Sequence, residues 1–402
     1  METLTKPTDT RLRRFTETGT VYPILFMISI THLLNDMMQS VIPAVYPLLK
    51  EKFGFTFAQI GIITLVFQMT SSLLQPFIGL YADRHPRPYS LAAGMCFTLL
   101  GLFTLSVAPG FVPILLAVGL IGCGSSVFHP ESSRVAQLAS GGRKGLAQSI
   151  FQVGGNAGSA FGPLLAALVV IPFGQASIGW FALAAILAIL ILSRIGRWYK
   201  LRLTVTANRP AAAAAAPAHH LGKRKIRLAL GILGVLVFSK YFYIASMTNY
   251  FTFFLMDKFE ISVQGAQYCL FTFLGASAVG TVAGGPLGDR FGRKYVIWGS
   301  ILGAAPFTLL LPYANLTCTI VLAVIIGLVI SSAFSAILVY ATDLMPGKVG
   351  MVAGIFFGLM FGLGGLGSAF FGWLADKTSI EFIFRISTLL PLLGIITGFL
   401  PN

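Results

Sequence analysis

The residues best suited to proton chemistry are a histidine and an aspartate that interrupt a long apolar stretch near the N-terminus. His32 and Asp36 are four positions apart, so a helix would place them one turn apart on the same face. An ionisable group inside an apolar span costs about 2.5–3.5 kcal/mol on insertion scales, which makes it a functional candidate. We expect Asp36 to bind and release a proton. The alternative is that it only forms a helix–helix hydrogen bond.

A second polar group surrounds Pro130 in a later apolar stretch. His129 can titrate at physiological pH, and Glu131 is a second candidate proton site. Arg134 either contacts a substrate or extends its guanidinium to the membrane interface. Because a proline frees a backbone carbonyl and disturbs the helix, this segment is expected beside a cavity or hinge.

Lys240 is embedded in an apolar stretch of the second half of the chain, at nearly the depth of Asp36. It either contacts an anionic substrate as a compact point charge or pairs with Asp36, and both roles can coexist. Neutral side chains that could form hydrogen bonds with a substrate are Asn35, Gln39, Gln152, Asn156, Tyr241, Tyr243 and Asn249.

The elements that carry these residues are apolar segments long enough to cross a bilayer. Of 402 residues, 56% are hydrophobic and only 10% are charged, and the mean hydropathy is +0.83. A soluble domain has about 25% charged residues, so the composition indicates a multi-pass membrane protein. The twelve predicted spans are 21–49, 57–81, 89–107, 111–137, 146–171, 176–199, 228–256, 263–286, 293–311, 315–343, 349–374 and 380–400.

The chain contains two copies of one unit. A short charged loop holds Gly285, Asp289, Arg290, Gly292, Arg293 and Lys294. A partial copy with Gly79, Asp83, Arg84 and Arg87 lies 206 positions earlier. A fixed offset of half the chain indicates a duplicated fold.

The division that follows is an N-terminal tail, a six-helix bundle, a basic linker and a second bundle. The predicted ranges are 1–20, 21–199, 200–227 and 228–402. Lysine and arginine concentrate in the tail, the even-numbered loops and the linker, so we expect both termini in the cytoplasm. The formal net charge of +15 is thus explained by membrane topology rather than by nucleic-acid binding.

These features resemble the major facilitator superfamily of transporters. The loop from Gly285 to Lys294 matches the hallmark motif of that superfamily, which implies a conformational latch on the cytoplasmic side; its earlier copy has Pro86 and Pro88 in place of a glycine and a basic residue. The fifth span carries Gly154, Gly158, Gly162 and Pro163, similar to a motif of proton-driven drug antiporters. As an alternative, these glycines form only a packing ridge.

Longer segments resemble the bacterial fosmidomycin-resistance transporters. They include residues 32–36, 125–134, 152–156, 239–243 and 292–300. The resemblance implies a monomer in the bacterial inner membrane that exports a small phosphonate drug, driven by the proton gradient and without a cofactor. One departure concerns the arginine that related antiporters have in the fourth span, because the matching position here is Val118.

Other classes fit less well. Ser125, Ser126 and His129 share one segment, so they do not form a nucleophile and a facing base, and we expect no enzyme. The four cysteines lack paired spacing, so neither a disulfide nor a metal site is predicted. The main alternative is a proton symporter that imports a small anion or sugar. A membrane sensor, which would bind without transport, is a further possibility.

Overall fold

Local signals in the sequence set the ends of several helices in the computed structural model, which describes residues 19–206, 222–345 and 349–401. Helix α4 begins at a capping box in which Thr56 and Gln59 bond each other's backbone N–H groups. Ser379 caps the start of α17 through its hydroxyl. Helix α3 ends at Gly54, whose φ of +65° favours glycine.

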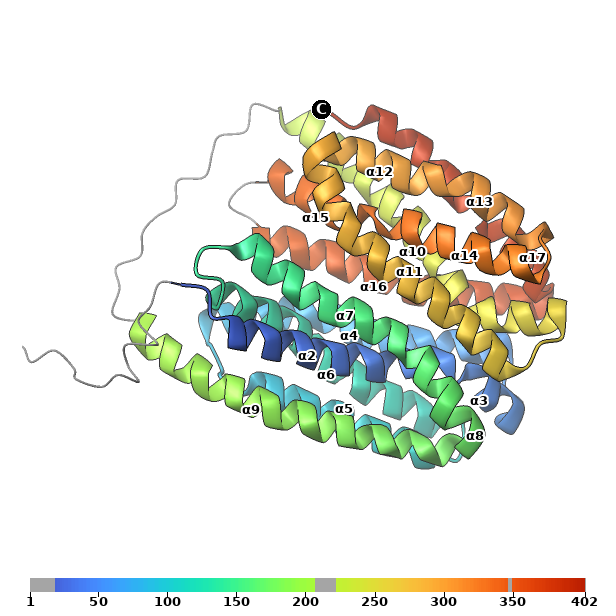
Figure 1. Ribbon diagram of the computed structural model, residues 1–402, viewed down its shortest axis with the longest axis horizontal. Helices are drawn as coiled ribbons and strands as arrows, with labels where there is room; N and C mark the ends of the chain where they lie inside the picture. Colours follow the sequence, from blue (N-terminus) through green and yellow to red (C-terminus); the bar gives the residue numbers. More distant parts are fainter. Residues whose placement is uncertain (1–18, 207–221, 346–348, 402) are drawn as a thin grey trace, which may run out of the picture.

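The first group of helices, α2 to α9, comes from the N-terminal part of the chain and lies in the lower part of Figure 1. Its helical elements are α2 (Tyr22–Ala44), α3 (Tyr46–Phe53), α4 (Phe57–Arg84), α5 (Ser90–Val107), α6 (Phe111–Leu138), α7 (Lys144–Leu165), the π-helical turn η1 (Ala166–Val170), α8 (Ile171–Phe173), η2 (Gln175–Trp180) and α9 (Phe181–Thr206). We call it the N-terminal group.

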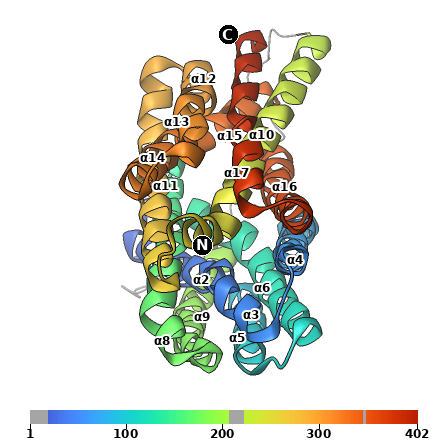
Figure 2. The same cartoon turned by 90° about the vertical axis from the view of Figure 1, so that its right-hand side faces the viewer.

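The second group, α10 to η5, lies above the first in Figures 1 and 2. Its elements are α10 (Lys223–Phe259), α11 (Val263–Phe291), α12 (Arg293–Ile301), η3 (Leu302–Ala304), α13 (Ala305–Leu310), η4 (Leu311–Tyr313), α14 (Leu316–Ser331), α15 (Ala333–Leu344), α16 (Val349–Lys377), α17 (Ile380–Ser387) and η5 (Leu390–Phe399). We call it the C-terminal group.

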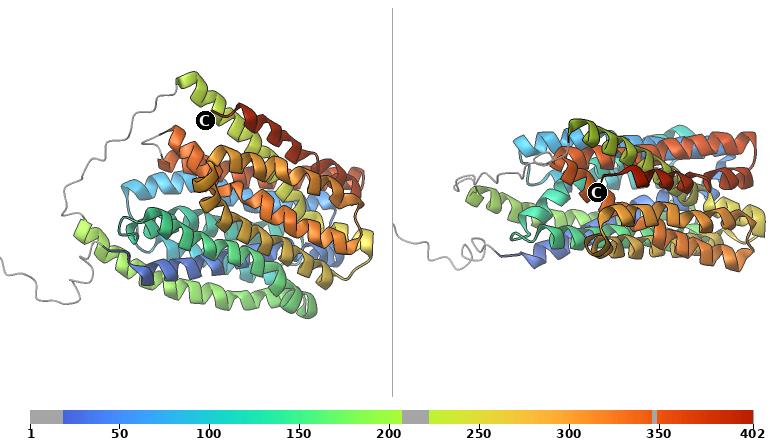
Figure 3. Two further views of the ribbon diagram at one scale, coloured as in Figure 1. Left: turned by 45° about the horizontal axis from the view of Figure 1, so that its top comes forward. Right: turned by 90° about the horizontal axis from the view of Figure 1, so that it is seen from above.

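Together the described residues form twelve helices that are long and apolar enough to cross a membrane. The views in Figure 3 show that the axes of these helices are roughly aligned, side by side. The predicted all-helical, twelve-span fold is therefore confirmed. The predicted tail lies mostly outside the described residues, as does the central part of the predicted linker. The described ends of that linker are helical, because α9 continues to Thr206 and α10 begins at Lys223.

Hydrogen bonds between the two groups gather at the end of the bundle that lies at the right of Figure 1, near α3 and α17. The carboxylate of Asp376, at the end of α16, accepts from the backbone N–H of Phe57 at 2.8 Å and of Ala58 at 2.7 Å. The hydroxyl of Tyr250 on α10 lies 3.5 Å from the carbonyl of Phe57 on α4, while its shorter bond, 2.6 Å to Ser368 on α16, stays within the C-terminal group. We call this end the closed end.

Two further contacts join the groups at the closed end. The side-chain amide of Gln267 on α11 donates to the carbonyl of Ala44 at 2.6 Å. The hydroxyl of Thr64 on α4 donates to Asn249 on α10 at 3.0 Å. Asn249, predicted as a substrate contact, therefore takes part in the junction between the groups in this conformation.

The sequence predicted a charged loop from Gly285 to Lys294, but this stretch is mostly helical, because α11 continues to Phe291 and α12 begins at Arg293. Gly292 ends α11 with a φ of +90°, a conformation that side chains with a Cβ rarely adopt, so the glycine is required there. Arg290 and Arg87 are exposed, and Gly79 lies near Pro130 of α6. Arg293 and Lys294 open α12. The side chains of Asp83, Arg84 and Asp289 fall outside what the structure describes, as do the surroundings of Gly285.

Candidate functional site

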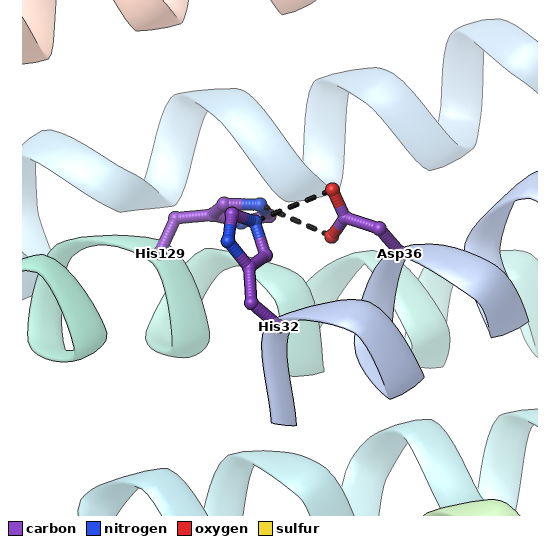
Figure 4. A group of neighbouring side chains, drawn as sticks. All are labelled: His32, Asp36 and His129. Carbon is purple, nitrogen blue, oxygen red and sulfur yellow. Dashed lines mark ion pairs between the residues drawn. The ribbon is translucent and has the colours of Figure 1, made fainter. Parts of the chain in front are cut away.

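Asp36 lies between two histidines where α2 meets α6 (Figure 4). His32 Nε2 is 3.3 Å from one carboxylate oxygen of Asp36, and His129 Nε2 is 3.5 Å from the other. The side chains of Asp36 and His129 are 16% and 15% exposed, whereas that of His32 is 2% exposed. Helix periodicity placed His32 beside Asp36, but only the fold brings His129 to them. We call these three residues the His–Asp cluster.

The orientation of both imidazoles is set by backbone carbonyls. His32 Nδ1 is 2.8 Å from the carbonyl oxygen of Phe151, which can only accept a hydrogen bond. That nitrogen therefore carries the hydrogen, and Nε2 of a neutral His32 presents its lone pair to Asp36. His129 Nδ1 is 3.1 Å from the carbonyl of Ser125 and 3.2 Å from its hydroxyl, and the carbonyl contact favours the same tautomer. When both histidines are neutral, three electron-rich groups converge on one point.

The glycines of the fifth span make room for this arrangement by packing α7 directly on α2. A Cβ at Gly154 would lie 2.0 Å from the carbonyl oxygen of Ser29, and one at Gly158 would lie 2.3 Å from that of Leu33. Gly162 meets Ser40 in the same way. These contacts are those of a small-residue packing ridge. The antiporter role inferred from the motif remains a prediction.

Gly155 is a residue of this site that sequence reasoning gave no role. A Cβ there would lie 2.4 Å from Nε2 of His32 and 2.9 Å from a carboxylate oxygen of Asp36. Phe151, one turn before, stacks on the His32 ring with centroids 4.0 Å apart. The only sequence signal for Phe151 was its position next to residues 152–156, which resemble the fosmidomycin-resistance transporters.

Polar neighbours and one aromatic residue from the other group complete the surroundings. Asn35 Nδ2 donates to Asp36 at 3.0 Å, and Gln39 Oε1 lies 3.3 Å from the hydroxyl of Ser125. Phe361 on α16 lies 5.8 Å from His129, measured between ring centroids. The cluster therefore sits where the N-terminal group faces the C-terminal group.

Glu131 and Arg134 point away from the cluster, although they follow His129 closely in sequence. Two helical positions turn the chain by about 200°, so Glu131 emerges on nearly the opposite face of α6 from His129. Glu131 is buried, 3.9 Å from Arg134 and 3.3 Å from the hydroxyl of Ser90 on α5. Arg134 donates to the carbonyl of Ala82 on α4. Both residues join helices within the N-terminal group in this conformation.

Lys240 does not pair with Asp36 here. It is 2% exposed, and its Nζ lies 5.5 Å from the ring of Tyr241 and 5.9 Å from that of Phe334 on α15. Among the described residues, no carboxylate lies within 4.0 Å of it. The sequence suggested a pair between Lys240 and Asp36 because the two lie at equal depth. Equal depth does not decide which helix faces meet, and here the two side chains face different neighbours.

The remaining predicted substrate contacts lie in different surroundings. Gln152 donates to Asn156 at 3.1 Å along α7, and both side chains are half-buried. The amide nitrogens of Asn156 and Gln39 and the hydroxyl of Tyr243 are buried, and none has a hydrogen-bond partner among the residues that the structure describes. These unpaired polar atoms could bond a substrate.

Comparison with known proteins gives the family. The sequence model described as Major Facilitator Superfamily matches residues 28–257 and 234–402. The chain belongs to this superfamily. Its members are transporters, so this multi-pass membrane protein is a transporter and not an enzyme.

Two curated relatives cover nearly the whole chain. The fosmidomycin resistance protein of Escherichia coli K12 is 59% identical over 387 residues, which are 96% of this chain and 95% of the relative. An uncharacterised transporter of the same superfamily from Bacillus subtilis, YfnC, is 43% identical over 95% of this chain and 94% of its own. The predicted resemblance to the fosmidomycin-resistance transporters is confirmed.

Solved structures share the fold at low sequence identity. A bacterial homologue of the human lysosomal transporter Spinster, in an inward-facing and occupied conformation, has a TM-score of 0.71 and 16% identity, and 94% of each chain is covered. The nucleoside transporter NupG has a TM-score of 0.74 and 11% identity, with 94% of this chain and all of NupG covered. These likenesses concern the superfamily fold alone.

Proposed function

We propose that this transporter exports fosmidomycin, or a related small phosphonate or amphipathic drug, in exchange for protons. The observation that carries the proposal is the 59% identity with the fosmidomycin resistance protein across nearly the full length of both chains. We propose that it works as a monomer in the bacterial inner membrane, with both termini in the cytoplasm. The proton gradient supplies the driving force, and no cofactor is involved.

The distribution of contacts between the two groups supports transport by alternating access. The closed end joins them through Asp376, Asn249 and Gln267. Lysine and arginine concentrate in loops on the side away from that end, which supports a periplasmic position for the closed end. In that orientation the described conformation is closed to the outside and corresponds to an inward-facing state. Export requires the closed end to open while the opposite end closes.

The His–Asp cluster is suited to bind the coupled proton. When the histidines are neutral, their Nε2 lone pairs face the Asp36 carboxylate, and a proton on either histidine turns that contact into an attractive one. The cluster lies against Phe361 of the other group, so its charge can favour one conformation over the other. His129 is the more accessible of the two histidines and is the better candidate for exchange with water.

The anionic substrate would be bound by positive charge and unpaired donors near the junction of the groups. Lys240 is a buried cation without a carboxylate partner among the described residues, and a phosphonate would supply the missing charge. The amide nitrogens of Gln39 and Asn156 are buried donors that could bond substrate oxygens. In this arrangement the substrate contacts both groups, with Lys240 on α10 and Gln39 and Asn156 on the side of the His–Asp cluster.

The test is fosmidomycin-driven proton movement in proteoliposomes that contain the purified transporter. We expect fosmidomycin added on one side to drive protons the opposite way. Asp36→Asn and His129→Asn should abolish the flux, whereas His85→Asn, which changes an exposed histidine near α4, should leave it unchanged. Proton movement in the same direction as the drug would establish symport instead. Absence of any flux in the parent would overturn the substrate assignment.

A further inference from the structure

The His–Asp cluster has the donor set and the spacing of a metal site. One ligand atom from each of His32, Asp36 and His129 can be chosen so that all three lie within 4.8 Å of one another. Imidazole nitrogen and carboxylate oxygen are the donors that divalent transition metals such as Zn²⁺ and Co²⁺ accept. The cysteine spacing gave no sign of such a site, because its ligands come from two helices and no cysteine takes part.

The separations are close to those around a tetrahedral ion. Zinc bonds of about 2.0–2.1 Å at tetrahedral angles place neighbouring ligand atoms about 3.3 Å apart. His32 Nε2 lies 3.3 Å from one carboxylate oxygen of Asp36 and His129 Nε2 lies 3.5 Å from the other, and a set with one atom from each residue lies within 4.8 Å. The three side chains would therefore move little to bind an ion between them.

The surrounding hydrogen bonds are those of a prepared site. A metal-binding histidine usually donates its other ring nitrogen to a carbonyl or carboxylate, which fixes its tautomer. The carbonyls of Phe151 and Ser125 hold His32 and His129 in this way, with both Nε2 atoms directed at Asp36. Asn35 donates to the carboxylate and fixes its orientation as well. A cation between the three groups would satisfy electron pairs that otherwise face one another.

We propose that His32, Asp36 and His129 bind one divalent transition-metal ion of the Zn²⁺ or Co²⁺ type. Three protein ligands leave a fourth position for water, as in open zinc sites. The partial exposure of Asp36 and His129 gives the ion a route of entry. An ion held there also occupies the position at which the proposed function places the coupled proton, so Zn²⁺ inhibits transport.

Binding is tested with Co²⁺, whose visible absorption reports tetrahedral coordination, on the full chain purified without a polyhistidine tag. We expect one Co²⁺ per chain, displaced by Zn²⁺. His129→Asn and Asp36→Asn should weaken the affinity by roughly 100-fold or more, because even outer neighbours of a metal contribute roughly 10–100-fold. The control is the triple variant His85→Asn/His219→Asn/His220→Asn, which removes the three other histidines of the chain and should bind Co²⁺ as the parent does.

The proposal is overturned if the triple variant loses the cobalt spectrum or if His129→Asn retains it. Should the cluster variants aggregate, X-ray absorption at the zinc edge of the loaded parent decides the question. Two imidazoles and one carboxylate are expected, and a spectrum without imidazole would contradict the site. The binding measurement involves no substrate, so its failure leaves the proposed drug export standing, and absence of fosmidomycin flux leaves the metal site standing.

Discussion

The hydrogen bonds between Asp376 and the start of α4 offer the most direct way to test the proposed opening of the closed end by mutation. The carboxylate accepts two backbone N–H groups at 2.8 and 2.7 Å, at the N-terminus of a 28-residue helix of the other group. Both the charge and the helix dipole favour this contact. Replacement by asparagine removes the charge and leaves a single acceptor oxygen, so Asp376→Asn should weaken the closed end.

The size of the effect follows from the contact. Hydrogen bonds to a charged group contribute about 1.5–3 kcal/mol each, and the side chain of Asp376 is exposed, so water competes for it. We therefore expect a loss of about 1–2 kcal/mol for the substitution, which changes the ratio of closed to open molecules by roughly 5–30-fold. The populations of the two conformations can be measured because opening changes distances across the closed end.

The assay is a distance measurement between spin labels at Glu51 and Glu260, which are exposed residues at the closed end in different groups. The labels are attached in a background without the four native cysteines. Asp376→Asn should raise the ratio of long-distance to short-distance molecules by roughly 5–30-fold, and Asp257→Asn, which changes an exposed carboxylate of α10 near the same end, should not. An unchanged distribution in Asp376→Asn, or an equal change in Asp257→Asn, would refute the reasoning.

Three further substitutions test the packing of the site. Gly155→Ala should lower the free energy of unfolding by about 1–3 kcal/mol, because the new methyl group meets His32. The control is Gly234→Ala, whose methyl group meets nothing within 4 Å and should leave thermal stability unchanged or raise it. Lys240→Met should raise the melting temperature and reduce drug flux, since it removes a buried charge without a described carboxylate partner; a lower melting temperature would show that the charge is satisfied. Tyr250→Phe should lower the free energy of unfolding by about 0.5–1.5 kcal/mol, because it removes the hydroxyl's bond to Ser368 within the C-terminal group, and an unchanged melting temperature would contradict this.

The fold could be predicted from the sequence because its determinants are local. A membrane span needs about 20 apolar residues, and this requirement marks each span separately. The contact of His32 with Asp36 is also local, since four positions are one helical turn. The predicted spans and the twelve-span fold agree with the structure for this reason.

The rest of the site depends on which faces of distant helices meet. His129 and Glu131 are neighbours in sequence, yet only His129 reaches Asp36, because α6 turns the two side chains apart. Lys240 lies at the right depth for Asp36 but contacts Tyr241 and Phe334 instead. Neither outcome can be derived from the apolar spans of the sequence. They fix the depth of a residue in its helix but not the residue that it meets on another helix.

The measurement that tests the central claim most directly is proton release on drug binding. In an antiporter, substrate and proton oppose each other's binding, and this coupling is reciprocal. Fosmidomycin added to the purified transporter in weakly buffered solution near neutral pH should therefore release protons, and Asp36→Asn should abolish the release. Proton uptake on binding, or release that persists in Asp36→Asn, would contradict the account.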